Sequence, residues 1–160
     1  MASTGVLFVC LGNICRSPAA EAMLAELIAR RGLGARIHAD SCATASFHAG
    51  KAPDPRAVAA AARLGYRIAP RQARQITDAD FRHFRYLVAM DRNNLRTLQG
   101  WAPPDFTGEI ELLTRYCADA AGQDVADPFY GSAEAFDDTL ALIERGVGAL
   151  LEQLCRRHRL

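Results

Sequence analysis

The chain has 160 residues, enough for a sizeable hydrophobic core, and we expect residues 1–160 to form a single domain. Half of the residues are hydrophobic and 23% are charged, which is typical of a globular protein and argues against a disordered or fibrous chain. The formal net charge is +1, too balanced for a protein that binds nucleic acid or a membrane surface through its overall charge. Affinity for an anion would therefore have to come from a local site.

The N-terminal residues contain no basic leader, and the apolar run at 6–11 is too short for a signal peptide or a membrane span. Five cysteines are an odd number in a chain large enough to fold without disulfides, which favours a reducing compartment. We therefore expect a cytoplasmic protein, and secretion without a signal peptide stays open. No cysteine or histidine spacing indicates a metal site, so seven of these residues are interpreted as structural: Cys42, Cys117, Cys155, His38, His48, His83 and His158.

The first half of the chain alternates between strand and helix signals. Residues 5–10 are a continuous apolar run with β-branched and aromatic members, which predicts a strand buried on both faces. Ser17 and Pro18 then have the pattern of a helix N-cap followed by proline at the first helical position. Apolar residues at helical spacing predict a helix that ends at Gly32, and residues 36–40 are predicted as a second strand.

The second half continues this alternation. Asp54 and Pro55 repeat the cap-plus-proline signal and open a helix through Leu64. Alternating strands and helices predict a parallel sheet covered on both sides, with ligands bound beyond the carboxyl ends of its strands. The remaining predicted elements are a short helix from 77 or 78 to 84, a strand at 86–90, a helix capped by Asp91, a strand at 109–113, a long loop at 114–131 and a helix at 132–157.

The junction between the first strand and the first helix, residues 10–18, reads CLGNICRSP. Wound around an anion, such a loop would point successive backbone N–H groups inward and add the positive end of the following helix. Gly12 and Asn13 are suited to the left-handed backbone that this curl requires. Arg16 has the planar fork that binds two phosphate oxygens at once. The other residues expected to form the phosphate-binding loop are Leu11, Ile14, Cys15 and Ser17.

Cys10 would lie at the bottom of this loop with its sulfur below a bound phosphorus. The donors that bind phosphate would also stabilise a thiolate, which is the nucleophilic form of cysteine. Ser17 is placed to donate a further hydrogen bond to the sulfur. A cysteine and an arginine six positions apart also occur by chance, but here they follow a predicted buried strand and precede a helix start. This context favours a nucleophilic cysteine.

On these residues the chain resembles the low-molecular-weight protein tyrosine phosphatases, whose phosphate loop is similar to residues 9–18. The resemblance implies an α/β, three-layer fold with a four-stranded parallel sheet in the order 2-1-3-4 flanked by helices. It also implies hydrolysis of phosphotyrosine through a phosphocysteine intermediate, without a metal or another cofactor. Further similar segments are Asp40-Ser41 with Thr44, residues 73–76, Met90-Asp91 with Asn94-Leu95-Arg96, residues 110–113 and residues 127–131.

The leaving tyrosine oxygen needs a proton, and a carboxyl group that donates it can then activate the water that cleaves phosphocysteine. Composition does not choose among 18 acidic residues. Asp127 precedes Pro128 in the long loop, although an Asp-Pro pair alone is more often just a turn. The resemblance implies that Asp127 is the general acid.

The resemblance also implies substrate and support residues around the loop. Phe47, Phe129 and Tyr130 would form the walls of a slot for the phosphotyrosine ring, although Phe47 and Phe129 fit a core role equally well. Asn13 and Ser41 would hold the loop in shape. In relatives a histidine often completes that network, but this chain has Pro70-Arg71 in the corresponding stretch, so the third partner is open.

Cys15 lies five residues after Cys10 and, by the same resemblance, is a redox partner that traps oxidised Cys10 as a disulfide. A small buried filler is the alternative for Cys15. The expected partners are phosphotyrosine proteins, with a bacterial tyrosine kinase as one candidate, and a monomer or weak dimer is expected.

Three other functions are compatible with parts of this pattern. Arsenate reduction needs a relay of three cysteines, which the distant Cys42 and Cys117 do not provide. A protein arginine phosphatase is the second alternative, but those family members tend to have threonine where this chain has Ile14. A catalytically inactive phosphotyrosine reader or thiol sensor is the third. Against it stands the joint presence of the residues needed for turnover, Cys10, Arg16, Ser17 and Asp127.

Overall fold

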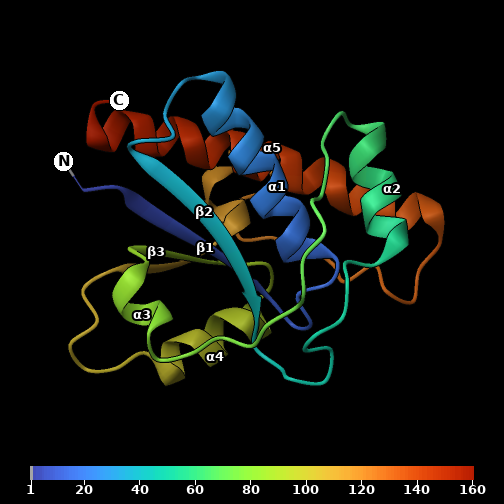
Figure 1. Ribbon diagram of the computed structural model, residues 1–160, viewed down its shortest axis with the longest axis horizontal. Helices are drawn as coiled ribbons and strands as arrows, with labels where there is room; N and C mark the ends of the chain where they lie inside the picture. The colour runs from blue at the N-terminus through green and yellow to red at the C-terminus, as the bar shows by residue number, and fades with distance from the viewer. Residues whose placement is uncertain (1) are drawn as a thin grey trace.

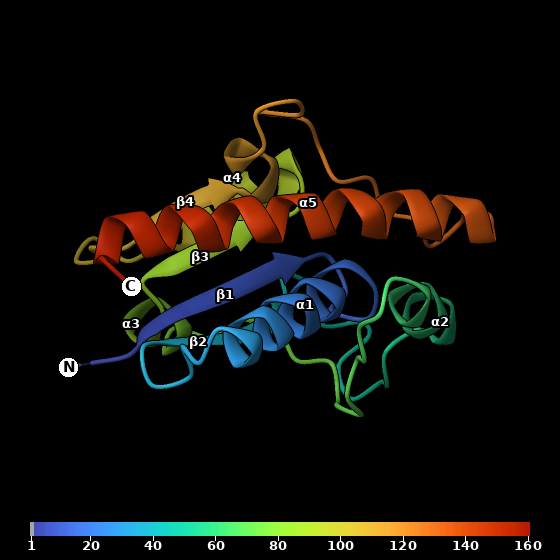
Figure 2. The same ribbon diagram turned by 90° about the horizontal axis from the view of Figure 1, so that it is seen from above.

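The structure is a computed structural model that describes residues 2–160. Four parallel strands form one sheet in the order β2-β1-β3-β4, which confirms the predicted α/β fold and strand order. Helices α1, α2 and α5 lie on one side of the sheet, and α3 and α4 lie on the other (Figures 1 and 2). The elements are β1 Thr4–Cys10, α1 Arg16–Arg30, β2 Ile37–Ala43, α2 Pro55–Arg63, α3 Asp80–His83, β3 Tyr86–Ala89, α4 Arg92–Trp101, β4 Glu109–Leu112, the 3₁₀ helix η1 Leu113–Tyr116 and α5 Ala133–His158.

Strand β1 lies in the middle of the sheet and is buried on both faces, as its apolar run predicts. Val6 and Phe8 belong to the hydrophobic core beneath α1 and α5, whereas Leu7 and Val9 belong to the core of the opposite face. Burial of each such side chain contributes about 1.5–3 kcal/mol to stability. These two cores hold β1 rigidly, and the loop that follows Cys10 therefore starts from a fixed point.

The start of α1 differs from the prediction. The helix begins at Arg16, and Cys15 precedes it without making a side-chain capping hydrogen bond. Ser17, which the sequence pattern predicts as the N-cap, is instead a fully buried residue of the first helical turn. Its hydroxyl lies 3.1 Å from the Cys10 sulfur. The hydroxyl is thus used by the loop and is not available to the helix end.

Strand β2 ends three residues later than predicted. All seven of its residues pair with β1, from Thr4 opposite Ile37 to Cys10 opposite Ala43. Its last residues include Ser41, which weakens the apolar signal on which the prediction depended. The extra length brings Ser41 to the carboxyl end of the sheet, beside the loop that follows β1.

The predicted caps of α2 and α4 are confirmed. The Asp54 carboxylate accepts a hydrogen bond from the Arg56 backbone N–H at 2.9 Å, and Pro55 follows at the first helical position. Asp91 and Asn94 form a reciprocal capping box at the start of α4.

None of the helices within residues 2–160 is long and apolar enough to cross a membrane.

The predicted long loop at 114–131 is partly ordered by local structure. It starts within η1, and the Val125 backbone N–H donates to the Met90 carbonyl at 2.8 Å. Val125 itself is fully buried, and the Thr139 hydroxyl on α5 donates to the Ala126 carbonyl at 3.3 Å. Just before Asp127, the loop is therefore held by hydrogen bonds to Met90, which directly follows β3, and to α5.

A buried carboxylate fastens α3 to the segment beside β2. Asp80 accepts hydrogen bonds from Arg74 at 2.9 and 3.0 Å and from the Thr77 backbone N–H at 2.8 Å. Burial alone would raise the pKa of Asp80, but the hydrogen bonds from Arg74 and Thr77 outweigh it and lower that pKa. The pKa of Asp80 is thus lower in the folded than in the unfolded protein, so its carboxylate stabilises the fold at every pH above the unfolded pKa. This stabilisation is lost as the pH falls through the folded pKa.

We expect Asp80→Asn to lower the free energy of unfolding at neutral pH by about 2 kcal/mol, because the charge-assisted hydrogen bonds to Arg74 are lost. The difference from the native chain should shrink below about pH 4, where an unfolded aspartate is protonated. Urea denaturation at neutral and acidic pH measures both values. An equal loss at both pH values would contradict this account of Asp80.

Candidate active site

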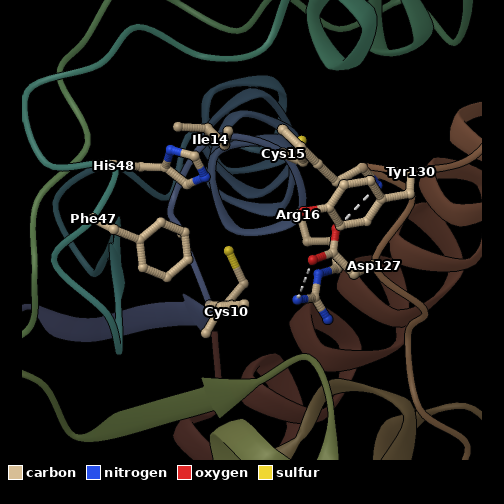
Figure 3. Close-up of a pocket in the computed structure, with 11 residues that line it drawn as sticks. Cys10, Ile14, Cys15, Arg16, Phe47, His48, Asp127 and Tyr130 are labelled. Atoms are coloured by element: carbon tan, nitrogen blue, oxygen red, sulfur yellow. Dashed lines mark hydrogen bonds and ion pairs between the residues drawn. The ribbon is translucent and has the colours of Figure 1, made fainter.

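A cavity of about 250 Å³ opens at the carboxyl end of β1 (Figure 3). The structure brings Cys10, Arg16 and Asp127 to this cavity from three places: the end of β1, the start of α1 and the loop before α5. Its other lining residues come from the phosphate-binding loop, the segment after β2 and the segment after Asp127: Leu11, Gly12, Ile14, Cys15, Phe47, His48, Phe129 and Tyr130.

The Cys10 side chain points into this cavity, although the residue is only 3% exposed (Figure 3). Its sulfur accepts a hydrogen bond from the Asn13 backbone N–H at 3.3 Å and lies 3.1 Å from the Ser17 hydroxyl. That hydroxyl accepts from the Asn13 side chain at 2.8 Å, and its single hydrogen has two acceptors within reach, the Cys10 sulfur and the Cys42 carbonyl at 3.3 Å. The sulfur at the base of the cavity thus has one backbone donor and one hydroxyl within hydrogen-bond distance.

Asn13 holds the loop in its curled shape. It has a left-handed backbone with φ of 58°, and its side-chain amide donates to Ser17 and to Ser41 at 2.9 Å. Its side-chain oxygen accepts from the Arg74 backbone N–H at 3.1 Å. These hydrogen bonds of Asn13 and Ser41 are the kind of contact that the predicted support of the loop requires.

Gly12 differs from the prediction, because Asn13 is the residue of this loop with a positive φ and Gly12 is not. Gly12 instead lies close to a neighbouring side chain, which would have to shift if a larger residue stood here. A Cβ atom built on it would lie 2.6 Å from Cδ2 of His48, closer than real contacts allow. His48, interpreted as structural from the sequence, thus packs against the phosphate-binding loop and lines the cavity.

Arg71 fills the place in the support network that the sequence leaves open. Its guanidinium donates to the Ser41 hydroxyl at 2.8 Å, to the Ser41 carbonyl at 3.1 Å and to the Asn13 side-chain oxygen at 3.4 Å. It also pairs with Glu21 on α1, which accepts a hydrogen bond from the Ser41 hydroxyl at 2.7 Å. Asn13 and Arg71 are 58 positions apart, so no local pattern reveals this contact.

We expect Arg71→Met to lower the activity on phosphotyrosine about tenfold, because losing roughly 1.4 kcal/mol of loop preorganisation changes a rate by that factor. Inorganic phosphate should also inhibit the variant more weakly, since the same loop binds it. Steady-state kinetics with phosphate as a competitive inhibitor measures both effects. Unchanged kinetics would show that the loop keeps its shape without Arg71.

Arg16 is only 2% exposed and is held in place by the fold. It donates to Asp91 at 2.8 Å and to the Val125 carbonyl at 2.9 Å. Burial acts to lower the pKa of Arg16, but the negative charges of Cys10 and Asp91 and the hydrogen bond to Asp91 raise it overall, so the guanidinium is always charged. Asp91, predicted only as a cap of α4, serves two partners, one through each carboxylate oxygen.

Asp127 lies at the rim of the cavity and is 41% exposed at its side chain. One of its oxygens is 3.6 Å from an Arg16 nitrogen, and the other accepts from the Phe129 backbone N–H at 3.1 Å. Figure 3 shows Asp127 and Arg16 together at one side of the cavity, with Cys10 across from them. A substrate phosphate bound by Arg16 would thus lie between the sulfur and the carboxylate.

Aromatic residues form the mouth of the cavity. Phe47 is 60% exposed and Tyr130 is 97% exposed, so neither belongs to the hydrophobic core. Phe129 is half-buried, and its ring meets that of Tyr130 edge-on at 4.9 Å between centroids. Phe47 and Tyr130 lie on opposite sides of the opening (Figure 3). The predicted pocket residues are therefore all at the cavity.

Cys15 is a second buried thiol at the cavity. Burial, together with the negative charges of Asp54, Cys10 and Asp127, raises the pKa of Cys15 to about 12. Cys15 is thus a protonated thiol at neutral pH and does not compete with Cys10 as a nucleophile.

Within residues 2–160, no group of three or more histidine, cysteine or acidic side chains is arranged to hold a metal ion.

Known structures share this fold over nearly the whole chain. The crystal structure of YfkJ from Bacillus subtilis matches with a TM-score of 0.90 and 36% identity, and the match covers 98% of each chain. A protein tyrosine phosphatase from Entamoeba histolytica also matches with a TM-score of 0.90, at 32% identity over 99% of this chain and 100% of that one. A Drosophila arginine phosphatase matches with a TM-score of 0.84 and 31% identity, covering 92% of this chain and 96% of that one.

The sequence comparisons agree. YfkJ, named a low molecular weight protein-tyrosine-phosphatase, is 37% identical over 155 residues, which are 97% of this chain and 98% of that protein. A family profile described as low molecular weight phosphotyrosine protein phosphatase matches residues 5–160. With Cys10 placed as a nucleophile at the base of an anion-binding loop, the chain therefore belongs to the low molecular weight phosphotyrosine protein phosphatase family.

Proposed function

We propose that Cys10, Arg16 and Asp127 carry out a two-step hydrolysis of phosphotyrosine. In the first step the Cys10 thiolate forms a bond to phosphorus, the bond from phosphorus to the tyrosine oxygen breaks, and Asp127 protonates that oxygen. In the second step Asp127 takes a proton from water, whose oxygen attacks phosphorus and releases Cys10 as a thiolate. Phosphate and tyrosine are the products.

The observation that supports this assignment most strongly is the arrangement of the three side chains around one small cavity. The contacts at the Cys10 sulfur are placed to stabilise it as nucleophile and as leaving group, and the fixed positive charge of Arg16 favours the negative charge on the equatorial phosphate oxygens. Asp127 is at the rim, where the leaving oxygen of a long substrate side chain would lie. The geometry supports attack by Cys10 at the base of the cavity and protonation by Asp127 at its rim.

The aromatic mouth supports phosphotyrosine over phosphoserine. A phosphate bound at Cys10 must be joined to its peptide through a cavity walled by Phe47 and Tyr130. The tyrosine side chain is long enough and has a ring that packs between these walls, whereas serine is too short to reach the sulfur. Phosphotyrosine proteins, with a bacterial tyrosine kinase as one candidate, are therefore the proposed substrates of a cytoplasmic monomer or weak dimer.

Phosphoarginine is the alternative substrate, because one structure that resembles this chain is a Drosophila arginine phosphatase. Ile14 lines the cavity and is 8% exposed, and its bulk leaves less room for a phosphoguanidinium than threonine would. The test is turnover of phosphotyrosine and phosphoarginine peptides in excess chelator. Faster metal-independent release from phosphotyrosine supports the proposal, and a preference for phosphoarginine would overturn the interpretation of Ile14.

Cys15 is proposed to protect Cys10 from irreversible oxidation. Hydrogen peroxide oxidises the Cys10 thiolate to a sulfenic acid, which condenses with the Cys15 thiol to form a disulfide and water. After brief peroxide treatment, dithiothreitol should restore most activity of the native chain but little activity of a Cys15→Ala variant. Residual activity and intact mass measure this, and equal recovery in both proteins would refute the role of Cys15.

A further inference from the structure

The first turn of α2 contacts both halves of the proposed catalytic machinery. The Asp54 backbone N–H donates to the Ile14 carbonyl of the phosphate-binding loop at 2.8 Å. Two residues later, the Arg56 guanidinium donates to the Phe129 carbonyl at 2.9 Å. From these contacts we infer that Arg56 is a positioning residue for the general acid, which holds the segment after Asp127 at a set distance from the phosphate-binding loop. This inference rests on the proposed role of Asp127.

The guanidinium of Arg56 is itself fixed by the start of the helix. It donates to both oxygens of Asp54, from Nε at 3.1 Å and from a terminal nitrogen at 2.8 Å. The Asp54 side chain is only 9% exposed and also caps α2 through the Arg56 backbone N–H. This bidentate pair leaves the second terminal nitrogen free for the Phe129 carbonyl. Arg56 is therefore an oriented fork and not a freely moving surface side chain.

Two aromatic rings complete the surroundings of Arg56. Its guanidinium carbon lies 5.3 Å from the ring centroid of Phe129 and 4.6 Å from that of Phe136, both within the range of cation–π contacts. Phe136 is fully buried on α5 and belongs to the hydrophobic core. Arg56 thus links the acid segment, residues 125–131 around Asp127, to α2 and to a buried residue of α5.

The acid segment is anchored differently on its two sides. Before Asp127, the carbonyls of Val125 and Ala126 accept from Arg16 and Thr139. After Asp127, the hydrogen bond from Arg56 to the Phe129 carbonyl joins residues 128–131 to another element. Within residues 2–160, the other hydrogen bonds of this stretch stay inside residues 127–131.

The peptide of Phe129 connects this anchor to the carboxylate. Its N–H donates to one Asp127 oxygen at 3.1 Å, while its carbonyl accepts from Arg56. A general acid must come within hydrogen-bond reach of the leaving oxygen, and misplacement by about 1 Å can cost up to roughly 100-fold in rate. Loss of Arg56 would loosen the Phe129 peptide and with it the half-exposed Asp127 carboxylate.

The test compares two substrates that differ in their need for the acid. Phenyl phosphate releases a strongly basic phenolate that needs a proton, whereas dinitrophenyl phosphate releases a weakly basic one that does not. We expect Arg56→Met to lower kcat/KM for phenyl phosphate about tenfold and for dinitrophenyl phosphate by less than about twofold. Arg56→Lys should show the same pattern, because an ammonium cannot make the bidentate pair and reach Phe129 together.

Arg63→Met is the matched control. Arg63 is at the other end of α2 and binds Asp137 on α5 at 2.6 and 2.9 Å, away from the acid segment. It should leave kcat/KM unchanged for both substrates. An Arg56 variant that loses equally on both substrates, or on neither, would overturn the positioning role.

The Asp127→Asn background separates this inference from the proposed function. If Arg56 acts through Asp127, then Arg56→Met should cost less than about twofold on phenyl phosphate once Asp127 is already replaced. A full tenfold loss in that background would overturn the inference while the role of Asp127 stands. If Asp127→Asn itself shows no dependence on the leaving group, the proposed acid is wrong, and the inference falls with it.

Discussion

Replacing Cys10 with serine is expected to abolish turnover of phosphotyrosine peptides, with kcat lowered by roughly 10⁴-fold or more. A serine hydroxyl at this position has no base beside it to take its proton, since the groups in contact with the sulfur are the Asn13 backbone N–H and the Ser17 hydroxyl. The anion-binding part of the loop is unaffected, because its backbone N–H groups and Arg16 are unchanged. Stopped assays for released phosphate measure the loss.

Binding should survive the same substitution. Isothermal titration of the Cys10→Ser variant with inorganic phosphate or a phosphotyrosine peptide is expected to show affinity within about tenfold of the native chain, since Arg16 supplies the charge-assisted hydrogen bonds. Cys155→Ser is the control, because Cys155 is near the end of α5 and away from the cavity. Turnover that persists in Cys10→Ser would exclude Cys10 as the nucleophile, and a native chain that binds without turnover would indicate a phosphotyrosine reader.

Replacing Asp127 with asparagine should lower kcat/KM on phosphotyrosine peptides by roughly 10²- to 10⁴-fold, the usual contribution of a general acid. Asparagine has a similar shape and can still accept from the Phe129 backbone N–H, so the loop should keep its position. What the variant lacks is the proton for the leaving oxygen. The loss should therefore be much smaller for dinitrophenyl phosphate, which is the outcome that distinguishes chemistry from folding.

The control for Asp127→Asn is Asp119→Asn in the same loop, whose carboxylate is 71% exposed and lies 3.7 Å from Arg145. It removes one negative charge without touching the cavity, and its kinetics should match those of the native chain. Equal losses on both substrates for Asp127→Asn would mean that Asp127 supports the loop or binds substrate. A different carboxyl group would then have to be the acid.

Sequence patterns predicted correctly the features that depend on neighbours along the chain. The apolar run before Cys10 could be recognised as a buried strand because both faces of the middle strand of a parallel sheet are covered. Asp54 and Asp91 could be recognised as caps because a helix start needs an acceptor for its first N–H groups. The order of the four strands came from the family resemblance, since local patterns do not set it.

Two errors of the sequence interpretation have one physical origin. The pattern predicts Ser17 as a helix cap and Gly12 as a left-handed residue, and both rules describe a backbone free of tertiary contacts. In the structure the Ser17 hydroxyl is directed to Cys10, and α1 starts without its help. Gly12 is confined by His48, a residue 36 positions away in the chain. Packing around the phosphate-binding loop overrides the local rule in both cases.

The sequence by itself determined the strand–loop–helix unit with Cys10 and Arg16, because its nucleophile, backbone donors and arginine are contiguous. Only the tertiary structure decided how this unit is supported. Arg71 reaches Asn13 and Ser41, Asp91 reaches Arg16, and Arg56 reaches Phe129, across separations of 30 to 75 positions. Such contacts depend on how the helices pack against the sheet, and an arginine or aspartate on the surface looks the same in the sequence whether or not it has a partner.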